Sequence, residues 1–370
     1  MAVRVCHLTS VHGPHDTRIF QKMCCSLANA GFEVYLVVAN AQSEVRSGVR
    51  IVGVEVPFAG RLSRMRKAAR AVYDKALELD ASLYHIHDPE LLPYALKLQK
   101  KGKKVIFDSH EDVPADILDK SWLGPLALRK LISYVYKVYE KRSVRRLSGL
   151  VSVLDPITQG FKHPRGITIH NYPKVDYFNM PKHDFGEESE PKFRLIYNGG
   201  LTRIRGIHHI IDAMDGLDEG YELLLMGPWE SDSYAQECKD LSGWARVRYM
   251  GMLDIHTCFG MLKAAQLGML LFGPVPNHLQ SLPNKSFEYI AAGIPMLMSD
   301  FPFWRKEFGD YAHFVNPQNP VAIASAVSSI ANDYAAVHAR CTNLGKKILA
   351  SKTWKREAER LVDYYHQLLN

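Results

Sequence analysis

Short apolar runs alternate with amphipathic segments along almost the whole chain. In the first half, these runs predict strands at residues 3–8, 34–39, 50–56, 83–86, 104–107, 150–153 and 167–169. Between them, helical periodicity is present at residues 19–30, 62–79 and 90–100. Alternation of this kind predicts an α/β fold built on a doubly wound parallel sheet.

The second half repeats the pattern after a polar segment at residues 172–192. Its predicted strands lie at residues 193–197, 221–226, 247–250, 267–272 and 296–299. Further helical segments lie at residues 208–214, 231–241, 257–263, 321–331, 335–350 and 353–369. A chain of 370 residues is too long for one ordinary core, so we expect one domain at residues 1–175 and another at 190–352.

One more helix has well-marked ends. It is predicted to begin at Asn284, a candidate N-cap, and to end at Gly293, which a proline follows closely. Lys285 and Glu288 are three residues apart, so they share one face of its first turn. A lysine at a helix N-terminus suits an anionic ligand, and the carboxylate beside it can accept hydrogen bonds from hydroxyl groups such as those of a ribose. An ion pair that only stabilises the helix is an equal alternative.

Histidine and acidic residues follow three strands predicted in the first half, within segments 12–18, 87–90 and 108–111. The candidate functional residues in these segments are Gly13, Asp16, Arg18, His87, Asp88, His110 and Glu111. Because the carboxyl ends of parallel strands lie at one edge of a sheet, we expect these residues to be close together. A single histidine is more often structural than catalytic, but three such clusters favour a functional site.

A glycine-rich segment follows the first strand of the second half. Gly199 and Gly200 allow a ligand to approach the backbone, and Arg203 and Arg205 lie just before the next predicted helix. This arrangement suits a diphosphate. It is not a Walker loop, and no GxGxxG motif is present, so the sequence does not favour a dinucleotide-dependent dehydrogenase. A glycine turn with two solvated arginines is the structural alternative.

Composition indicates a soluble globular protein, with 47% hydrophobic and 23% charged residues. The six cysteines contain no CxxC pair, so we expect them to be reduced in a cytoplasmic protein. Residues 3–8 resemble a buried strand rather than a signal peptide, and no apolar run reaches membrane-spanning length.

The net charge of +7 is concentrated in the first half, where residues 1–180 hold 27 of the 46 Lys and Arg but only 17 of the 39 Asp and Glu. No zinc-finger, RNP-like or helix-turn-helix pattern accompanies this excess, so we expect no nucleic-acid partner. Apolar and aromatic residues lie among the basic residues around Trp122 to Tyr139. We therefore weigh two interpretations equally: solvated helix faces, and peripheral contact with an anionic membrane surface.

Taken in order, these motifs resemble those of the GT-B glycosyltransferases, and within them the retaining family-4-like group 1 enzymes. The resemblance covers nearly the whole chain. It rests on segments 16–20, 30–34, 87–90, 107–111, 198–206 and 283–295. It implies two Rossmann-like domains that face a central cleft, with the nucleotide-sugar donor bound mainly by the second domain and the acceptor by the first. It also implies that the last helix, at 353–370, crosses back to the first domain.

Residue roles follow from the same resemblance. Glu288 matches the glutamate that holds the donor ribose, and Lys285 and Arg205 match basic positions near the diphosphate. Met252 and Leu253 match the loop that receives the base. Further matches are His110 near the reacting sugar, Gly13 facing the diphosphate, and the acceptor-side residues Asp16, Arg18, His87, Asp88 and Glu111.

The sequence departs from the family pattern at two positions. Gln280 stands where the group often has a second acid that contacts the donor sugar, and Gly200 stands where an arginine is common, a role for which Arg203 is a candidate. The reaction implied is transfer of a sugar, with retention, from a nucleotide diphosphate, most commonly UDP, to a glycan or lipid-linked acceptor. No DxD-like pair lies in the relevant loop, so we expect no essential metal and no cofactor beyond the donor. Two alternatives are a GT-B nucleotide-sugar epimerase and a non-catalytic sugar-nucleotide-binding protein.

Overall fold

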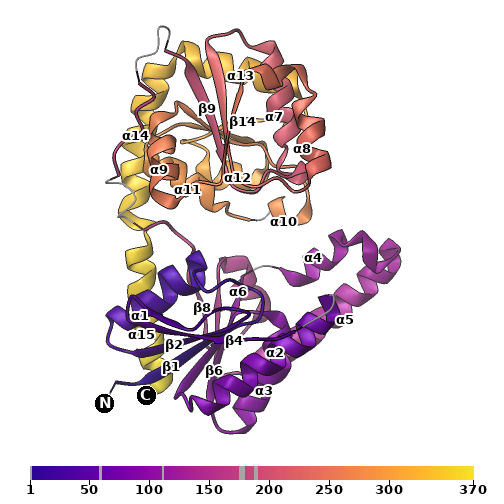
Figure 1. Cartoon of the computed structure of the whole chain (residues 1–370), viewed down its shortest axis with the longest axis vertical. Helices are drawn as coiled ribbons and strands as arrows, with labels where there is room; N and C mark the ends of the chain where they lie inside the picture. The colour runs from indigo at the N-terminus through magenta and orange to yellow at the C-terminus, as the bar shows by residue number, and fades with distance from the viewer. Residues whose placement is uncertain (1, 58–60, 111, 175–179, 187–190, 280) are drawn as a thin grey trace. The chain divides into compact units, whose positions relative to one another are not determined.

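The computed structural model describes residues 2–57, 61–110, 112–174, 180–186, 191–279 and 281–370. The chain divides into two compact units. Unit 1 comprises residues 1–171 together with 354–370, and unit 2 comprises residues 172–353. Each unit is an α/β domain with its own sheet (Figure 1).

The sheet of unit 1 has the order β3-β4-β2-β1-β5-β6-β7-β8 and is parallel except for the β3–β4 pair. Its strands are β1 (Arg4–Thr9), β2 (Glu33–Ala39), β3 (Glu44–Arg46), β4 (Val49–Val54), β5 (Leu83–Ile86), β6 (Lys104–Ser109), β7 (Gly149–Ser152) and β8 (Gly166–Thr168). Its helices are η1 (Thr17–Cys24), α1 (Cys25–Asn29), α2 (Arg61–Glu78), η2 (Pro89–Leu91), α3 (Leu92–Lys100), α4 (Val113–Asp119), η3 (Ser121–Leu123), α5 (Leu126–Val144), α6 (Asp155–Phe161) and α15 (Trp354–Leu369).

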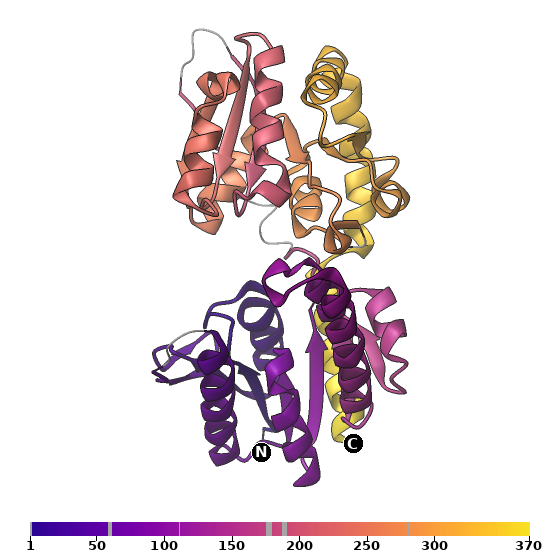
Figure 2. The ribbon, with the colours of Figure 1, turned by 90° about the vertical axis from the view of Figure 1, so that its right-hand side faces the viewer.

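Helices cover both faces of this sheet (Figure 2). Side chains alternate between the faces along each strand. In β5, Leu83 packs with η1 and α15, whereas Tyr84 and Ile86 pack with α2 and α3 on the other face. The same alternation in β1 and β6 sends Val5 and Ile106 towards α15. Polar residues two positions farther along these strands therefore belong to the face that α15 covers.

Unit 2 contains a six-stranded parallel sheet with the order β11-β10-β9-β12-β13-β14. Its strands are β9 (Phe193–Asn198), β10 (Tyr221–Met226), β11 (Val247–Gly251), β12 (Leu267–Leu270), β13 (Met296–Ser299) and β14 (His313–Val315). Its helices are η5 (Arg203–Arg205), α7 (Ile207–Ala213), η6 (Met214–Gly216), α8 (Asp232–Lys239), η7 (Ser242–Arg246), α9 (Ile255–Ala264), α10 (Pro276–Leu279), α11 (Asn284–Ala292), α12 (Pro302–Phe308), α13 (Pro320–Asn332) and α14 (Tyr334–Ser351). One hydrophobic core joins this sheet to its helices.

Helix α11 differs from its prediction at one end. The N-cap position is Pro283, and Asn284 is already the first helical residue without a side-chain capping bond. The C-terminal end is as predicted, because Gly293 adopts a left-handed conformation with φ of 76°. None of the helices within the described ranges is long and apolar enough to cross a membrane.

Candidate functional site

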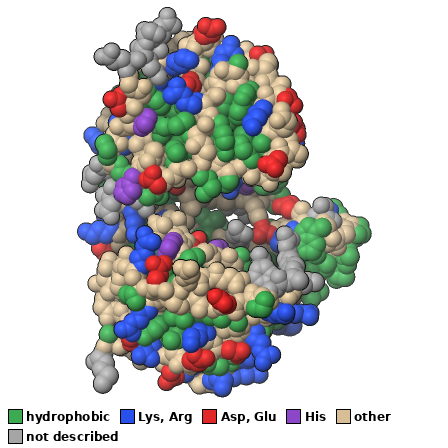
Figure 3. All heavy atoms as spheres, viewed as in Figure 1, with side chains coloured by type: hydrophobic (Ala, Val, Ile, Leu, Met, Phe, Trp, Pro, Cys, Tyr) green, Lys and Arg blue, Asp and Glu red, His purple; other side chains and the backbone are tan. Residues whose placement is uncertain are grey.

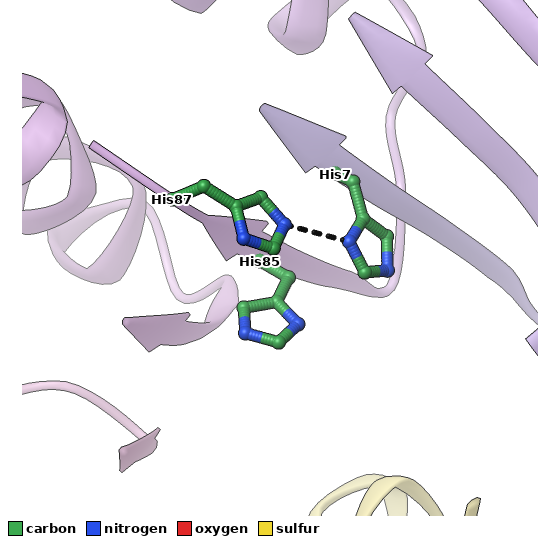
Figure 4. A group of neighbouring side chains, drawn as sticks. All are labelled: His7, His85 and His87. Carbon is green, nitrogen blue, oxygen red and sulfur yellow. Dashed lines mark hydrogen bonds between the residues drawn. The ribbon is translucent and has the colours of Figure 1, made fainter. Parts of the chain in front are cut away.

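A polar cluster lies on the α15-covered face of the unit 1 sheet. His7 comes from β1, His85 from β5, His87 from the residue after β5, and Asp108 from β6. These strands are neighbours in the order β1-β5-β6, so side chains far apart in sequence meet here (Figure 4). All four side chains are almost completely buried.

Asp108 is the centre of this cluster. Arg18 donates from Nε to Oδ2 over 3.0 Å and from Nη2 to Oδ1 over 2.9 Å, which forms a bidentate buried ion pair. His110 Nε2 lies 2.7 Å from the same Oδ2 atom. Burial alone would raise the pKa of Asp108, but Arg18 and His110 outweigh this and hold the pKa well below its usual range. Asp108 is therefore an ionised acceptor surrounded by donors.

The histidines beneath Asp108 form a continuous chain of contacts. His7 Nδ1 lies 2.8 Å from His87 Nε2, as drawn in Figure 4. Tyr365 of α15 places its hydroxyl 3.0 Å from His7 Nε2 and 2.7 Å from His85 Nδ1. Burial lowers the pKa of all three histidines, so their rings are neutral at pH 7.

Asp88 anchors the loop that follows β1. Its Oδ2 atom accepts hydrogen bonds from the backbone N–H of Ser10 (2.5 Å) and the hydroxyl of Thr9 (2.9 Å). Asp16 fixes the other end of this loop, because its Oδ1 atom accepts the backbone N–H groups of Arg18 and Ile19 at the start of η1. The loop is thus tied down at both ends beside the polar cluster.

A second cluster lies in unit 2, where the carboxyl end of β9 meets the N-terminus of α11. Gly199 has a φ of 120°, and a Cβ at this position would lie 2.6 Å from Nζ of Lys285. Arg205 donates from Nη1 to the carbonyl of Gly200 over 3.2 Å. The two cations therefore lie beside the same glycine pair, an arrangement that suits an anionic ligand such as a diphosphate.

Glu288 is oriented by a neighbour on β9. The side-chain amide of Asn198 donates to Glu288 Oε2 over 2.8 Å. Burial lowers the pKa of Lys285, and the nearby Glu288 carboxylate partly offsets this. The other amide atom, Asn198 Oδ1, is buried and has no hydrogen-bond partner within the described part of the chain. A buried polar atom without a partner costs free energy unless a ligand or water satisfies it.

Three neighbouring strands of unit 2 end in glycines with positive φ: Gly199 after β9, Gly227 after β10 and Gly251 at the end of β11. A Cβ on Gly227 would lie 2.1 Å from the carbonyl oxygen of Gly199, so only glycine allows this close approach. Met252 follows directly and is 78% exposed, while Leu253 packs partly against the core. Glycine at these strand ends therefore allows backbone conformations and close approaches that a side chain would block.

Comparison with known proteins identifies the family. Residues 17–165 match the model of the glycosyl transferase 4-like domain, and residues 192–333 match that of the glycosyl transferases group 1. The chain belongs to the group 1 glycosyltransferases. A search of curated protein sequences found no match.

Solved structures show that this glycosyltransferase has the GT-B fold. Sucrose-phosphate synthase from Thermosynechococcus elongatus aligns with a TM-score of 0.78 at 17% identity, over 99% of each chain. Anabaena HepE, solved with UDP-glucose, aligns at 0.72 and 12% identity over 98% of this chain and 99% of that one. A trehalose-6-phosphate structure from E. coli, bound with UDP-2-fluoro glucose, aligns at 0.69 and 12% identity over 99% of each chain. The predicted family, fold class and enzyme class are thereby confirmed.

Half of the predicted site residues lie together in two groups. Arg18, His87 and His110 meet on Asp108 in unit 1, and Gly199, Gly200, Arg205, Lys285 and Glu288 meet in unit 2. Arg203 lies apart from the second group, because its guanidinium pairs with Glu237 and stacks on Tyr234. Gly13 lies in open space, since a Cβ added to it would have no atom within 4 Å. Glu111 and Gln280 lie outside the described residues.

Sequence reasoning missed His7, His85 and Tyr365 as members of the site, and it included Asp108 only within segment 108–111, not among the candidate residues. A signal was present at the end of β5: His85 lies in the strand and His87 directly follows it, two residues farther on, so both belong to the same sheet face. Tyr365 carried no local signal, since 358 residues separate it from His7.

Among the residues that the structure describes, two groups of side chains bring three metal-ligating atoms within 4.8 Å of one another: His7 with His85 and His87, and His87 with Asp108 and His110. In the second group, Asp108 Oδ2 already faces Arg18 Nε, His87 Nδ1 and His110 Nε2 at 3.2 Å or less. The adjacent guanidinium charge opposes a bound cation. In the first group, His7 and His87 bond to each other and Tyr365 bonds His7 and His85, while His85 Nε2 has no partner among the described residues.

Proposed function

We propose that this glycosyltransferase transfers a sugar from a UDP-sugar to a hydroxyl of a glycan or lipid-linked acceptor, with retention at the anomeric carbon. The observation that carries the proposal is the unit 2 cluster, in which Lys285 and Arg205 flank the Gly199–Gly200 backbone beside Glu288. Support for the donor comes from HepE, which was solved with UDP-glucose. We assign the diphosphate to Lys285 and Arg205, the ribose to Glu288, and the base to the backbone around Met252 and Leu253.

Departure of the nucleotide diphosphate is the step that these cations assist. Negative charge grows on the leaving phosphate in the transition state, and preorganised cations in a partly buried site stabilise it more strongly than water does. Burial already lowers the pKa of Lys285, so a dianionic ligand would relieve the cost of its buried charge. We propose that no metal ion is needed, because the two side chains supply the positive charge. Full transfer activity in excess EDTA is the expected result, and loss of activity that Mg²⁺ or Mn²⁺ restores would refute it.

Substitution of each cation tests the proposal. Lys285→Ala and Arg205→Ala should each lower kcat by at least about 100-fold, the usual loss when a group that stabilises transition-state charge is removed. The matched control is Arg305→Ala, which removes an exposed arginine of the same unit that pairs with Asp300. Transfer from a radiolabelled UDP-sugar measures all three. Retention of near wild-type turnover by both site variants would overturn the assignment.

We also propose that the acceptor is located near a membrane surface. Apolar side chains on η3 and α5 are exposed, including Trp122 (63%), Leu131 (60%) and Tyr134 (67%). Figure 3 shows hydrophobic side chains gathered at the projecting end of α4 and α5. Lys130, Lys137 and Lys141 lie on the same helix. An apolar face edged by lysines suits anionic lipid headgroups and the acyl region below them.

A further inference from the structure

The contacts with Asp108 determine how the protons are arranged on the buried histidines of unit 1. His87 Nδ1 and His110 Nε2 also lie 3.3 Å from each other, but Asp108 Oδ2 is the nearer partner of both nitrogens. Asp108 is ionised and can only accept, so His87 Nδ1 at 3.2 Å and His110 Nε2 at 2.7 Å must both carry a proton. A neutral imidazole has one donor and one acceptor nitrogen. His87 Nε2 is therefore an acceptor.

The same rule of one donor and one acceptor nitrogen assigns the remaining hydrogen bonds. His7 Nδ1, 2.8 Å from His87 Nε2, must be the donor, which leaves His7 Nε2 as an acceptor. The hydroxyl of Tyr365 then donates to His7 Nε2 over 3.0 Å, and its oxygen accepts from His85 Nδ1 over 2.7 Å. His85 Nε2 is the acceptor left at the end, and it has no hydrogen-bond partner within the described ranges. In every hydrogen bond of this series the donor lies on the His85 side and the acceptor on the Asp108 side.

We propose that Tyr365 and His7 are positioning residues for the transfer reaction: with His85 and His87 they form a one-directional hydrogen-bonded relay that ends on Asp108 and holds His110 as an Nε2–H donor. His110 then keeps Nδ1 as its proton-accepting nitrogen. Its side chain is 17% exposed, whereas the relay residues below it are buried, so it is the member of the network that a ligand can reach. Only the use of His110 in the transfer reaction rests on the proposed function.

The relay gives α15 a defined part in the site. Loss of the Tyr365 hydroxyl would leave His7 Nε2 and His85 Nδ1–H unpaired in a buried environment, at considerable cost. Without that hydroxyl, no donor holds His7 in the Nδ1–H form, and in the alternative Nε2–H form two acceptors would face each other between His7 and His87. To remove that conflict, His87 must give up its bond to Asp108. A substitution on α15 thereby changes the hydrogen bonds of Asp108, the residue that bonds His110.

Long-range ¹⁵N–¹H NMR of the full chain, labelled with ¹⁵N-histidine, tests the relay without any substrate. At pH 7, His7, His85 and His87 should all be in the Nδ1–H form, and His110 should carry its proton on Nε2. Single histidine-to-glutamine variants assign the signals. A buried relay histidine in the Nε2–H form would overturn the proposal.

Two adjacent tyrosines of α15 provide the matched pair of variants. Tyr365→Phe removes the relay hydroxyl, whereas Tyr364→Phe removes another buried hydroxyl that bonds the backbone at Leu150 and Arg165. We expect Tyr365→Phe to change the His7 and His87 signals and to lower kcat about five- to tenfold with the donor KM within twofold. We expect Tyr364→Phe to leave the histidine signals and kcat unchanged, although it should lower Tm about as much as Tyr365→Phe does.

The two arms distinguish failure of the relay from failure of the proposed function. Equal effects of both variants on the histidine signals, or none from Tyr365→Phe, would refute the relay. If the wild-type signals match the relay and Tyr365→Phe alone disturbs them while no UDP-sugar is turned over, the relay stands and the assigned reaction is wrong. Unchanged kcat in Tyr365→Phe despite altered His87 signals would refute the positioning role.

Discussion

At the residue scale, Gly199 is a position where the backbone conformation and the placement of Lys285 both depend on the absence of a side chain. Its φ of 120° disfavours any side chain, and a Cβ would lie 2.6 Å from Cε and Nζ of Lys285. Gly199→Ala should therefore destabilise the fold by about 1–3 kcal/mol and also displace the ammonium group, with a loss in kcat/KM of at least about tenfold. Chemical denaturation and donor kinetics measure the two effects.

Gly102→Ala is the control for backbone strain alone. Gly102 also has positive φ, 78°, but a Cβ added there would have no atom within 4 Å. This variant should lose a similar amount of stability and keep its activity. If Gly199→Ala behaves like this control, the contact with Lys285 has no importance for the donor site.

Glu140 is a buried carboxyl of α5 whose pKa is raised to about 7, chiefly by burial. Because the folded-state value exceeds the ordinary value of 4.5, the protonated group stabilises the protein at low pH, and this contribution is lost as pH rises from about 4.5 through about 7. Glu140→Gln should therefore gain stability relative to wild type above pH 7, by up to about 3 kcal/mol, and little at pH 5.

Urea unfolding of both proteins at pH 5 and pH 8.5 measures this difference. Glu78→Gln serves as the control, since Glu78 is exposed at the end of α2. A Glu140→Gln difference that stays constant with pH would show that Glu140 does not titrate in this window.

At the element scale, the helix α5 shows the limit of pattern reading. The apolar runs predicted the central strands correctly, because parallel strands that are buried on both faces consist almost entirely of apolar residues. In α5, apolar residues such as Leu131, Tyr134 and Val135 are exposed, while Ser133 and Glu140 are buried. The apolar residues of α5 therefore mark its exposed face rather than the face that packs against the domain. For this reason the sequence pattern did not predict a helix over these residues.

The candidate sites divide in the same way. Lys285 and Glu288 were predictable because both lie on one short helix with a glycine end. The link from Tyr365 to His7 was not, because tertiary packing of α15 creates it over 358 residues of sequence. Arg203 and Arg205 could not be ranked from sequence, and the structure separates them because Arg203 pairs with Glu237 whereas Arg205 bonds the Gly200 carbonyl.

The exposed face of α5 also predicts membrane binding. The full chain should sediment with vesicles that contain phosphatidylglycerol, and high salt should weaken this because the lysines contact anionic headgroups. Leu131→Ser combined with Tyr134→Ser should lower the bound fraction several-fold without lowering Tm, since both side chains are exposed. Val321→Ser, at a 79% exposed apolar position of α13, is the control. Equal sedimentation of all three proteins would contradict the proposal.

At the scale of the whole molecule, the division of the chain makes donor binding separable. Unit 2 is continuous in sequence, residues 172–353, and has its own core and sheet. Unit 1 is discontinuous, because residues 354–370 return to it and supply Trp354, Leu361 and Tyr365 to its core. A fragment of residues 172–353 should therefore fold alone, whereas residues 1–171 without α15 should not, because they expose the core face that α15 covers.

The unit 2 fragment tests how much of the donor site one domain contains. Asn198, Gly199, Arg205, Lys285 and Glu288 are all within it, so it should bind UDP with a Kd within about tenfold of the full chain, a difference of about 1.4 kcal/mol or less. Binding should raise its Tm in a UDP-dependent manner, because a ligand that binds only the folded state stabilises it. The Lys285→Ala fragment should lose this shift, which excludes nonspecific stabilisation. A folded fragment without UDP affinity, beside a full chain that binds UDP tightly, would show that residues of unit 1 supply most of the donor affinity, and the diphosphate would then have to be reassigned towards the loop after β1.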